Sequence, residues 1–404
     1  MQEPPHGDSA SGAGVHILGV GSTAFGPQAV GSFRSLLAEA VETALTDAGI
    51  EAAAVDEVHH ANFTGALTDA QNHQAPLVAD LVGGDVPAIR HENACASGGF
   101  AMWSAVRAIR SGAAEIVLVT GVEHLSPLST GEVTTALAMA ADELYEVRNG
   151  LTFPGAYALM ARSYISAFDP PDPRKALSSI AVKNHAHASV NPLAHFQSTV
   201  DLQTAMEAPM VADPLNLYDS CPISDGAAAV VLAATSALPA GAAEAADVRI
   251  RGVGAASDHL ALQTRSCIHA TVATARAAGR AFTDAALTPE DVDIAEVHDC
   301  FTIAEVLALE ALGFYEPGGA LGAADRGETA AGGRLPTNLS GGLKAKGHPV
   351  GATGVSQIAE LTKLLRGDHP AAADIETPAV GVAHNAGGTV ATAVVHLLEV
   401  ADHG

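Results

Sequence analysis

The chain has 404 residues, 48% of them hydrophobic, and a formal net charge of −25. This length and hydrophobic content predict a globular protein with a large buried core and two or three domain-sized units. The negative charge argues against a surface for nucleic acid or an anionic membrane and fits a cytoplasmic protein. It excludes no small anionic substrate, because a few local cations can bind one.

The ends of the chain and its cysteines carry no sign of export. Residues 1–13 are polar and rich in Pro, Gly and Ser, which predicts a disordered tail rather than a signal peptide. The last four residues are not a peroxisomal signal of the Ser-Lys-Leu kind, and no apolar run reaches the ~18 residues that span a bilayer. The four cysteines lack zinc-type spacing and are expected to be free thiols in a reducing compartment: Cys95, Cys221, Cys267 and Cys300.

One pattern of strands and helices occurs twice along the chain. The segment Val-His-Ile-Leu-Gly-Val-Gly at 15–21 returns as Val-Arg-Ile-Arg-Gly-Val-Gly at 248–254, and both are typical of strands closed by glycine. A helix and a further strand follow at nearly constant offset, with helix ends at 46–50 and 283–287 and strands at 55–59 and 292–298. The repeat indicates two related halves in a layered α/β architecture.

The same register gives Cys95 and His348 equivalent places in the two halves. Each precedes an expected helix and then an apolar strand. These are helix 100–111 and strand 116–120 after Cys95, and helix 355–366 and strand 380–383 after His348. A pseudo-twofold axis would therefore bring the two helix starts, and the two side chains, together.

The domain boundaries follow from where the repeat is interrupted. Residues 126–207 break the pattern with Pro, His, Asn and aromatic residues and are expected to form an inserted loop domain over the active-site face. The first half then consists of 14–125 and 208–238, including a core strand within 224–234, and the second half spans 247–404. A linker rich in Pro, Gly and Ala at 239–246 separates them.

Two motifs place a reactive side chain where glycine-rich backbone gives way to an amphipathic helix. Cys95 lies in His-Glu-Asn-Ala-Cys-Ala-Ser-Gly-Gly at 91–99, and the positive end of the helix dipole would lower its pKa and favour a nucleophilic thiolate. His348 lies in Gly-His-Pro-Val-Gly-Ala-Thr-Gly at 347–354 and is interpreted as the group that activates Cys95 or stabilises a thioester enolate. The alternatives are a buried core cysteine and a helix-capping histidine.

Two further motifs hold candidate catalytic residues. His298 and Cys300 lie two apart directly after an expected strand, so both side chains can point into one pocket. The alternative is a surface histidine beside a core cysteine. His384 opens His-Asn-Ala-Gly-Gly at 384–388, between expected strands 380–383 and 390–398, where glycine amides would suit an oxyanion. The alternative there is a plain hairpin turn.

Other reactive side chains are given simpler roles. The histidines of 184–187 and His195 are attributed to loop polarity or substrate contact, because zinc sites usually add cysteine or carboxylate ligands. Lys344 and Lys346 are expected to be solvated. Cys221 and Cys267 are interpreted as structural or incidental.

Together these motifs resemble the thiolase superfamily and, within it, the sterol-carrier-protein type of thiolase. The resemblance covers nearly everything from about residue 14 to the end. It rests on His-Asp-Cys-Phe at 298–301, His-Asn at 384–385, Lys-Asn-His-Ala-His-Ala-Ser-Val-Asn-Pro at 183–192 and Cys-Pro-Ile-Ser-Asp-Gly-Ala-Ala-Ala at 221–229. It implies a thiolase fold of two pseudo-twofold-related βαβαβαββ halves in α/β/α/β/α layers.

The resemblance also implies a role for each motif residue. Cys95 matches the nucleophile that takes up the acyl group, and His348 matches the histidine that activates it and donates to the thioester oxygen of acetyl-CoA. Cys300 matches the acid/base cysteine, with His298 beside it in the oxyanion hole. The backbone amide of Cys95 and one from the loop after His384 would form a second oxyanion hole. CoA is then a substrate, and no metal or redox cofactor is implied.

The implied partners are acyl-CoA and CoA, within a homodimer or a dimer of dimers and without nucleic acid or membrane. The chain lacks the fused sterol-carrier domain and the peroxisomal ending of animal members, which argues against sterol side-chain substrates. Some bacterial relatives of this type work beside a small OB-fold partner, so the resemblance allows one here.

The predicted reaction is thiolytic cleavage of a 3-ketoacyl-CoA in lipid or fatty acid metabolism, or the reverse Claisen condensation, through an acyl-cysteine intermediate. Three alternatives stay open. A decarboxylating ketosynthase would use Cys95, His348 and His384 and have no need of Cys300. A retro-aldol carbon–carbon lyase would act on a CoA thioester without an acyl-accepting thiolate, and a non-enzymatic acyl-CoA-binding scaffold would need none of these groups.

Overall fold

The computed structural model describes residues 14–27, 32–238 and 248–401. The expected tail at 1–13 and the linker at 239–246 lie outside this range. The strands are β1 (Val15–Ser22), β2 (Glu57–Ala61), β3 (Ala88–His91), β4 (Ile116–Glu123), β5 (Met210–Ala212), β6 (Leu215–Asn216), β7 (Gly226–Ala234), β8 (Val248–Ser257), β9 (Ile294–Glu296), β10 (Val380–Gly387) and β11 (Thr392–Val400). The α-helices are α1 (Phe33–Ala48), α2 (Gly65–Thr68), α3 (Ala75–Ala79), α4 (Ser97–Arg110), α5 (Thr130–Ala138), α6 (Phe153–Phe168), α7 (Pro173–Ala188), α8 (Leu202–Glu207), α9 (Val272–Ala285), α10 (Thr302–Ala311), α11 (Ala320–Asp325), α12 (Gly342–Ala345) and α13 (Thr353–Arg366).

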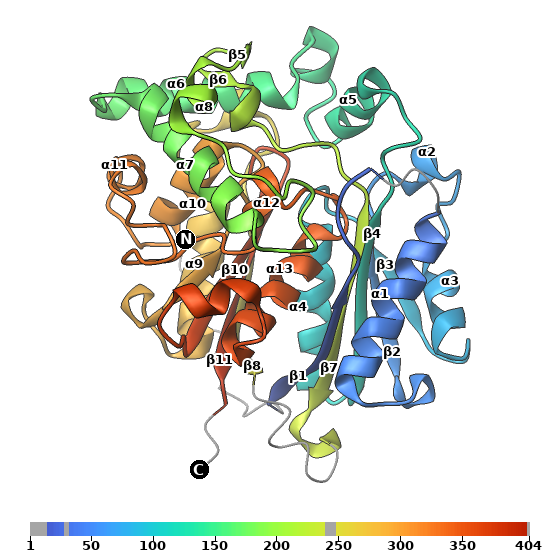
Figure 1. Cartoon of the computed structure of the whole chain (residues 1–404). Helices are drawn as coiled ribbons and strands as arrows, with labels where there is room; N and C mark the ends of the chain where they lie inside the picture. The colour runs from blue at the N-terminus through green and yellow to red at the C-terminus, as the bar shows by residue number, and fades with distance from the viewer. Residues whose placement is uncertain (1–13, 28–31, 239–247, 402–404) are drawn as a thin grey trace, which may run out of the picture.

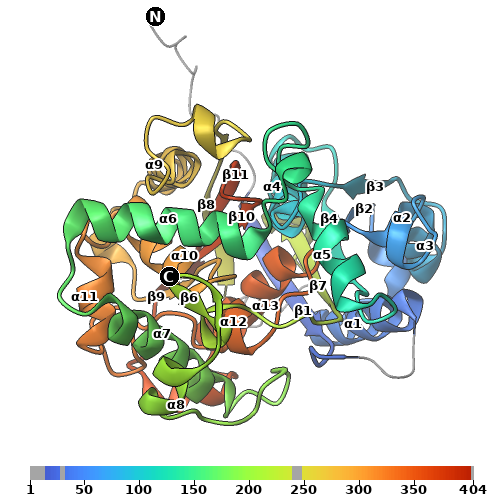
Figure 2. The same cartoon turned by 90° about the horizontal axis from the view of Figure 1, so that it is seen from above.

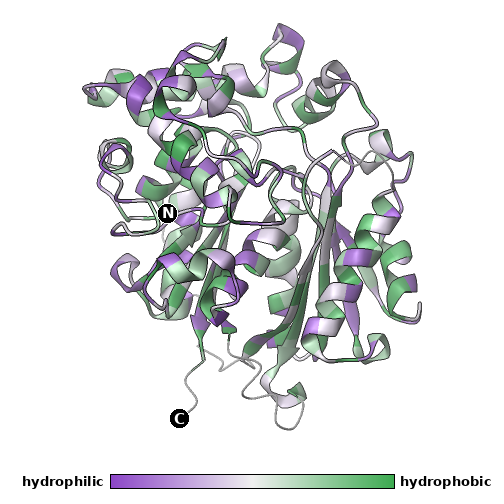
Figure 3. Cartoon of the chain, viewed as in Figure 1, coloured by the Kyte–Doolittle hydropathy of each residue, from purple (hydrophilic) through white to green (hydrophobic). Residues whose placement is uncertain are grey.

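Two half-sheets enclose a pair of helices. The described strands of the main sheet follow the order β3-β2-β4-β7-β1-β8-β11-β10-β9, and β1 and β8 join its halves through a short pairing. Helices α4 and α13 pack against strands of both halves, while α1 covers the outer face of the first and α9 that of the second. Figure 1 shows the resulting helix, sheet, helix, sheet and helix layers, and Figure 3 shows the strands to be mostly hydrophobic. The predicted layered architecture is confirmed.

The sequence repeat is visible as a repeated contact between strand and helix. If a Cβ atom were added to Gly19 or Gly21 of β1, it would lie 2.3 or 2.2 Å from a backbone oxygen of α1. At Gly252 and Gly254 of β8, the same atoms would lie 2.4 and 2.0 Å from backbone oxygens of α9. Both helices therefore cross their strand on glycine, because no larger residue leaves room for the backbone to approach.

Helices α4 and α13 meet near their N-terminal ends, again at glycines. A Cβ on Gly98 would lie 2.9 Å from the Gly354 nitrogen, and a Cβ on Gly354 would lie 2.2 Å from the Gly99 nitrogen. This close approach brings together the segments that precede the two helices. The expectation that Cys95 and His348 become neighbours is thereby confirmed.

Among its described residues, the second half has no full counterpart of β3. In place of that strand, a single parallel bridge links Ala295 of β9 to Thr337. The carbonyl of Pro336 accepts a hydrogen bond from the Ala295 N–H at 3.0 Å, but proline has no N–H with which to extend a ladder. The βαβαβαββ order is thus complete in the first half and shortened in the second.

The inserted segment at 126–207 is mainly helical and contains α5 to α8. These helices lie over one end of the two half-sheets in both Figure 1 and Figure 2. Helix α7 packs on α10, α11 and α12 of the second half, and α6 also contacts α10. Across the described residues, no helix is both long enough and apolar enough to cross a membrane.

Strand β10 runs past the position where the sequence predicts a turn. It pairs with β11 from Val380 through Gly387, so His384 and Asn385 are buried strand residues. The predicted loop at 384–388 is therefore wrong for all but its last residue. These polar side chains remain inside the strand because each finds hydrogen-bond partners in neighbouring elements.

Candidate active site

Cys95 lies just before the first turn of α4, with Ala96 as the N-cap residue. Its sulfur accepts a hydrogen bond from the backbone N–H of Gly388, which favours the thiolate. Burial has the larger effect, however, and together with the carboxylates of Glu123 and Glu92 it raises the pKa of Cys95 to about 12. The expectation that the helix end lowers this pKa is wrong for the free enzyme. Deprotonation of Cys95 therefore needs a base close by.

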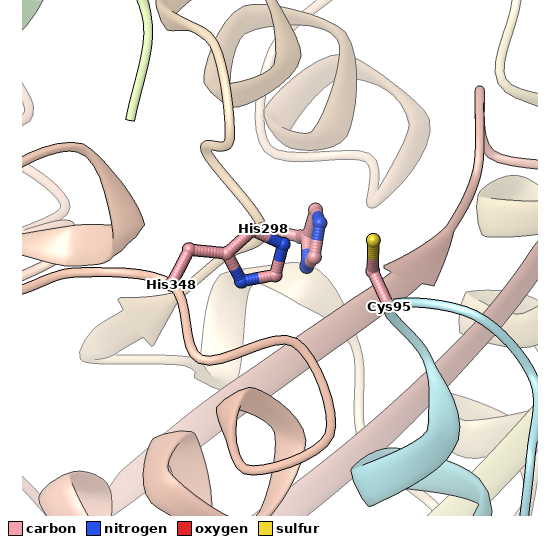
Figure 4. Close-up of side chains that lie close together, drawn as sticks. All are labelled: Cys95, His298 and His348. Atoms are coloured by element: carbon pink, nitrogen blue, oxygen red, sulfur yellow. The ribbon is translucent and has the colours of Figure 1, made fainter. Parts of the chain in front are cut away.

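Two imidazoles lie next to this thiol. The Cys95 sulfur and one ring nitrogen each of His298 and His348 are all within 4.8 Å of one another. The rings of His298 and His348 meet edge to face, with centroids 5.0 Å apart. Figure 4 shows the three side chains pointing into one space from separate segments of the chain. The motifs at 91–99, 298–301 and 347–354 thus form a single site.

The hydrogen bonds of His298 assign its tautomer. Asn385 donates one Nδ2 proton to the Cys95 carbonyl at 3.0 Å and the other to Nδ1 of His298 at 3.1 Å, while its Oδ1 accepts from the Gly99 N–H. Burial and the neighbouring His348 hold the pKa of His298 well below its ordinary value, so the ring is neutral. With Nδ1 accepting, the proton sits on Nε2. That N–H is buried and has no hydrogen-bond partner among the described residues.

His348 has the opposite tautomer. The Thr353 hydroxyl donates to the Pro349 carbonyl at 3.0 Å, so its oxygen is left to accept from Nδ1–H of His348 at 2.7 Å. Burial lowers the pKa of His348 to about 3, and the ring is again neutral. Its Nε2 therefore carries a lone pair, and within the described chain this atom has no hydrogen-bond partner. One histidine beside Cys95 is thus a base and the other a proton donor.

His384 lies behind His298. Its Nδ1 accepts from the backbone N–H of His298 at 3.5 Å, and its Nε2 hydrogen-bonds the Thr274 hydroxyl at 2.9 Å. Both ring nitrogens are therefore engaged within the protein. This position suits a residue that holds the His298 backbone, and it argues against the ketosynthase alternative, which needs His384 to reach the substrate.

A cavity of about 160 Å³ opens above the catalytic thiol. Three thiols line it, from Cys95, Cys221 and Cys300, together with the hydroxyl-bearing ring of Tyr157. The inserted segment supplies much of the remaining wall: Val133, Thr134, Leu137, Phe153 and Pro154. Cys221, interpreted from the sequence as structural or incidental, is thus a wall residue of this cavity.

Cys300 is the buried thiol of this group. Its backbone carbonyl accepts a hydrogen bond from the Cys221 N–H at 3.0 Å, which ties the two cysteines side by side. Burial raises the pKa of Cys300 well above its ordinary value, and Cys221 and Cys95 add to that effect. Asp299, between His298 and Cys300, instead accepts from Asn184 and Leu343. Cys300 lines the cavity, whereas His298 is not part of its described wall and instead lies next to Cys95 and His348.

Glu123 is a site residue that the motifs did not reveal. It ends β4, is fully buried, and accepts hydrogen bonds from the backbone N–H groups of Phe63, Thr64 and Gly351 at 2.9 to 3.0 Å. These bonds tie the loop that carries His348 to the first half-sheet. The signal in the sequence was a carboxylate at the end of an otherwise apolar strand, which a chain buries only with several donors.

The two lysines of 344–346 are buried rather than solvated. Lys346 forms an ion pair with Glu360 at 2.7 Å. The Lys344 ammonium lies 5.9 and 5.8 Å from the ring centroids of Phe196 and Tyr218. The expectation of solvated side chains is wrong because α12 lies beneath α7 and the inserted segment packs over it.

The histidines of the inserted segment at 126–207 form hydrogen bonds that hold this segment in place. His185 and His187 hydrogen-bond the carbonyls of Ser198 and Asn338, and His195 hydrogen-bonds the Ser224 hydroxyl. None of the three belongs to the cavity wall formed by the described residues. Cys267 lies 3.3 Å from Nε2 of His269, likewise outside that wall.

The Cys95, His298 and His348 group has ligand types that suit a soft metal ion. The hydrogen bonds argue against that use. Because Asn385 donates to Nδ1 of His298, the nitrogen of this ring that is free of partners carries a proton and has no lone pair for a metal. Only Cys95 and His348 then offer ligand atoms, fewer than the three protein ligands of a typical catalytic zinc site.

Comparison with known proteins places both halves of the chain in one family. The family model described as the thiolase N-terminal domain matches residues 15–236, and the one described as thiolase C-terminal domain-like matches residues 254–400. The two matches cover most of the chain. The first match ends just after β7 and the second begins within β8, the strand with which the sequence repeat begins again.

Relatives and a solved structure agree with these matches. An acetyl-CoA acetyltransferase of Methanothermobacter thermautotrophicus is 42% identical over 95% of this chain and 98% of its own length. Human sterol carrier protein 2 is 32% identical over 92% of this chain and 70% of its own length. The structure of the Ltp2-ChsH2(DUF35) aldolase has a TM-score of 0.81 at 24% identity, covers 97% and 99% of the two chains, and supports the fold alone.

These findings agree with the site, in which a cysteine, a basic imidazole and a proton-donating imidazole lie next to one another, and the cysteine and the basic imidazole line the cavity. The resemblance to sterol-carrier-protein-type thiolases is confirmed by the match to sterol carrier protein 2. The chain belongs to the thiolase family and is an acyltransferase.

Proposed function

We propose that the protein cleaves 3-ketoacyl-CoA with CoA, or runs the reverse condensation of acetyl-CoA, with Cys95 as the acyl carrier. The observation that supports this most is the pair of opposite tautomers beside Cys95. His348 Nε2 can take the thiol proton, and His298 Nε2–H can donate to an oxyanion. Cys300 lines the same cavity and supplies a second thiol for proton transfer at carbon.

In the cleavage direction, His348 takes the proton of Cys95 and the thiolate attacks the 3-keto carbon of the substrate. The N–H groups of Cys95 and Gly388 receive the oxyanion of this adduct. The bond between C2 and C3 then breaks, and its electron pair forms the enolate of acetyl-CoA. His298 and the now protonated His348 hold the enolate oxygen, while Cys300 gives its proton to C2. CoA finally takes the acyl group from Cys95: the CoA thiol gives its proton to the Cys300 thiolate, and the departing Cys95 sulfur regains its proton from His348.

The experiment that tests this function is an assay of several 3-ketoacyl-CoA esters with and without free CoA. Cleavage is expected only when CoA is present, and it should persist in a metal chelator because no step uses a metal. Cleavage of the 3-ketoacyl-CoA esters without CoA would contradict this function, and cleavage of a 3-hydroxyacyl-CoA without CoA would indicate the retro-aldol lyase instead. Condensation restricted to malonyl thioesters would indicate the ketosynthase, and activity lost to the chelator would contradict the metal-free mechanism.

Replacing His348 with alanine is expected to lower turnover by roughly 10²–10³-fold, the usual loss for one oxyanion donor. The loss should be larger if the base function also limits the rate. The variant should stay folded, because among the described residues the ring of His348 hydrogen-bonds only Thr353. Steady-state kinetics and thermal unfolding provide the measurements. Near-normal turnover would mean that His348 has only a structural role in its loop.

We further propose that the enzyme is a cytoplasmic homodimer or dimer of dimers that acts in lipid or fatty acid metabolism. We also propose a small OB-fold protein as a second component. The support for a second component is the name of the Ltp2-ChsH2(DUF35) aldolase, which couples that protein to a DUF35 protein. Sedimentation of the purified chain, alone and with a candidate OB-fold partner, tests both proposals. A monomeric sedimentation coefficient would contradict the dimer, and an unchanged coefficient after the partner is added would contradict the second component.

A further inference from the structure

Tyr157 is a fully buried residue of α6 whose hydroxyl lies at the cavity. The hydroxyl donates to the carbonyl of Gly388 at 3.0 Å. The ring stacks on Phe301 with centroids 4.7 Å apart. A phenylalanine would pack equally well on Phe301, so packing alone does not account for the hydroxyl.

The phenol lies between the two thiols of the reaction. On one side it contacts Gly388, whose N–H donates to the Cys95 sulfur. On the other side it faces the Cys300 side chain in the same cavity wall. A phenol has a single O–H to donate. It cannot serve the Gly388 carbonyl and the Cys300 sulfur at once.

We propose that Tyr157 is a positioning residue that stabilises the thiolate of Cys300 during proton transfer at carbon. The inference rests on the proposed acid/base role of Cys300. While Cys300 is a thiol, the Tyr157 O–H donates to the Gly388 carbonyl. When Cys300 has given its proton to the substrate carbon, the O–H turns to the Cys300 sulfur. The phenol proton never leaves its oxygen, so only the thiol proton moves to or from carbon.

The electrostatics of the cavity agree with this role. Burial and two neighbouring thiols raise the pKa of Cys300, whereas a hydrogen bond donated by Tyr157 acts in the opposite direction. A donor to a buried anion has a large effect, because little else there solvates the charge. Removing the hydroxyl should therefore raise the pKa of Cys300. Because proton abstraction requires the thiolate, the limb of the pH profile that rises with the thiolate fraction should move to higher pH.

The test is the exchange of acetyl-CoA methyl protons with deuterated water, followed against pH in wild type and Tyr157→Phe. We expect the rising limb to move up by about one to two pH units, as for the loss of a charge-assisted hydrogen bond. At a fixed pH on the rising limb, the exchange rate of Tyr157→Phe should be about 10–100-fold lower than that of wild type. Acylation of Cys95 by acetyl-CoA should continue, because its base, His348, is unchanged.

Tyr164→Phe is a matched control on the same helix. Tyr164 is also fully buried, its hydroxyl donates to Glu310 at 2.6 Å, and its ring packs on Phe168. It is not part of the described cavity wall. Tyr164→Phe also removes a phenol hydroxyl from α6, and it should leave the pH profile of exchange unchanged.

Equal pH profiles of exchange for wild type and Tyr157→Phe overturn the inference. The inference is also overturned if Tyr157→Phe and Tyr164→Phe lose the same exchange activity with no shift of the rising limb. If Tyr157→Phe does not fold, 3-fluorotyrosine placed at position 157 supplies the test, because its phenol is a stronger donor. The limb should then move to lower pH, and an unchanged limb overturns the inference. Wild type that does not exchange protons at all overturns the proposed role of Cys300 itself, which distinguishes that failure from a failure at Tyr157.

Discussion

Replacing Cys95 with alanine is expected to lower thiolysis by roughly 10⁴–10⁶-fold, the range found when members of a nucleophile–base unit are removed. The alanine has no atom that can carry the acyl group, and among the described residues the group that joins a thiol to the two imidazoles contains Cys95 rather than Cys221 or Cys300. The CoA-dependent cleavage assay measures this loss. Mass spectrometry of wild type after incubation with acetyl-CoA should place the added acyl mass on the peptide that contains Cys95.

Cys267→Ala is the matched control for this change. Cys267 is a partly buried free thiol that contacts His269, and it is absent from the cavity wall of the described residues. Its replacement should leave both acylation and turnover unchanged. An acyl group found on Cys300 in wild type would reverse the two roles that we propose for the cysteines.

Replacing Cys300 with alanine is expected to lower thiolysis and methyl-proton exchange of acetyl-CoA by about 10²–10⁴-fold, the contribution of a positioned general acid or base. A thiolase moves a proton to or from the α-carbon, whereas a decarboxylating enzyme obtains its carbanion by loss of carbon dioxide. Cys95 should still become acylated in this variant, because His348 and Gly388 remain in place. Exchange, thiolysis and acylation can be measured on the same preparation.

Cys221→Ala tests whether any thiol in the cavity would serve. Cys221 lies beside Cys300 and lines the same wall, so its replacement perturbs the same space without removing the proposed acid. We expect exchange and thiolysis to continue in Cys221→Ala. If they also continue in Cys300→Ala, Cys300 is not the acid/base, and retained condensation with a malonyl thioester would favour the ketosynthase.

The fold could be predicted from local patterns in the sequence. The repeat of 15–21 at 248–254, the glycines within it and the helix that follows are properties of short segments, and each half folds around them. The layered architecture and the meeting of Cys95 with His348 follow from that repeat. The shortened counterpart of β3 does not follow, because a single bridge at Thr337 leaves no periodic pattern.

The reacting residues could also be identified from motifs and family resemblance, since Cys95, His298, Cys300 and His348 each lie in a distinctive segment. Their chemical states could not. The tautomer of His298 depends on Asn385, whose same amide group bonds the carbonyl of Cys95 across 290 residues. The position of His384 behind His298 likewise depends on a strand that continues where a turn was expected.

The pKa of Cys95 shows the difference between what the local sequence predicts and what the tertiary structure decides. Its place at a helix N-terminus is a local property, and that property predicts a lowered pKa. Burial instead raises the pKa of Cys95, because desolvation depends on every segment packed around the thiol, including α5 and α6 of the inserted region. The residue types and the repeat therefore determine which groups react and where they meet. Only the tertiary structure decides how they are charged, because burial and hydrogen-bond partners come from segments far apart in the chain.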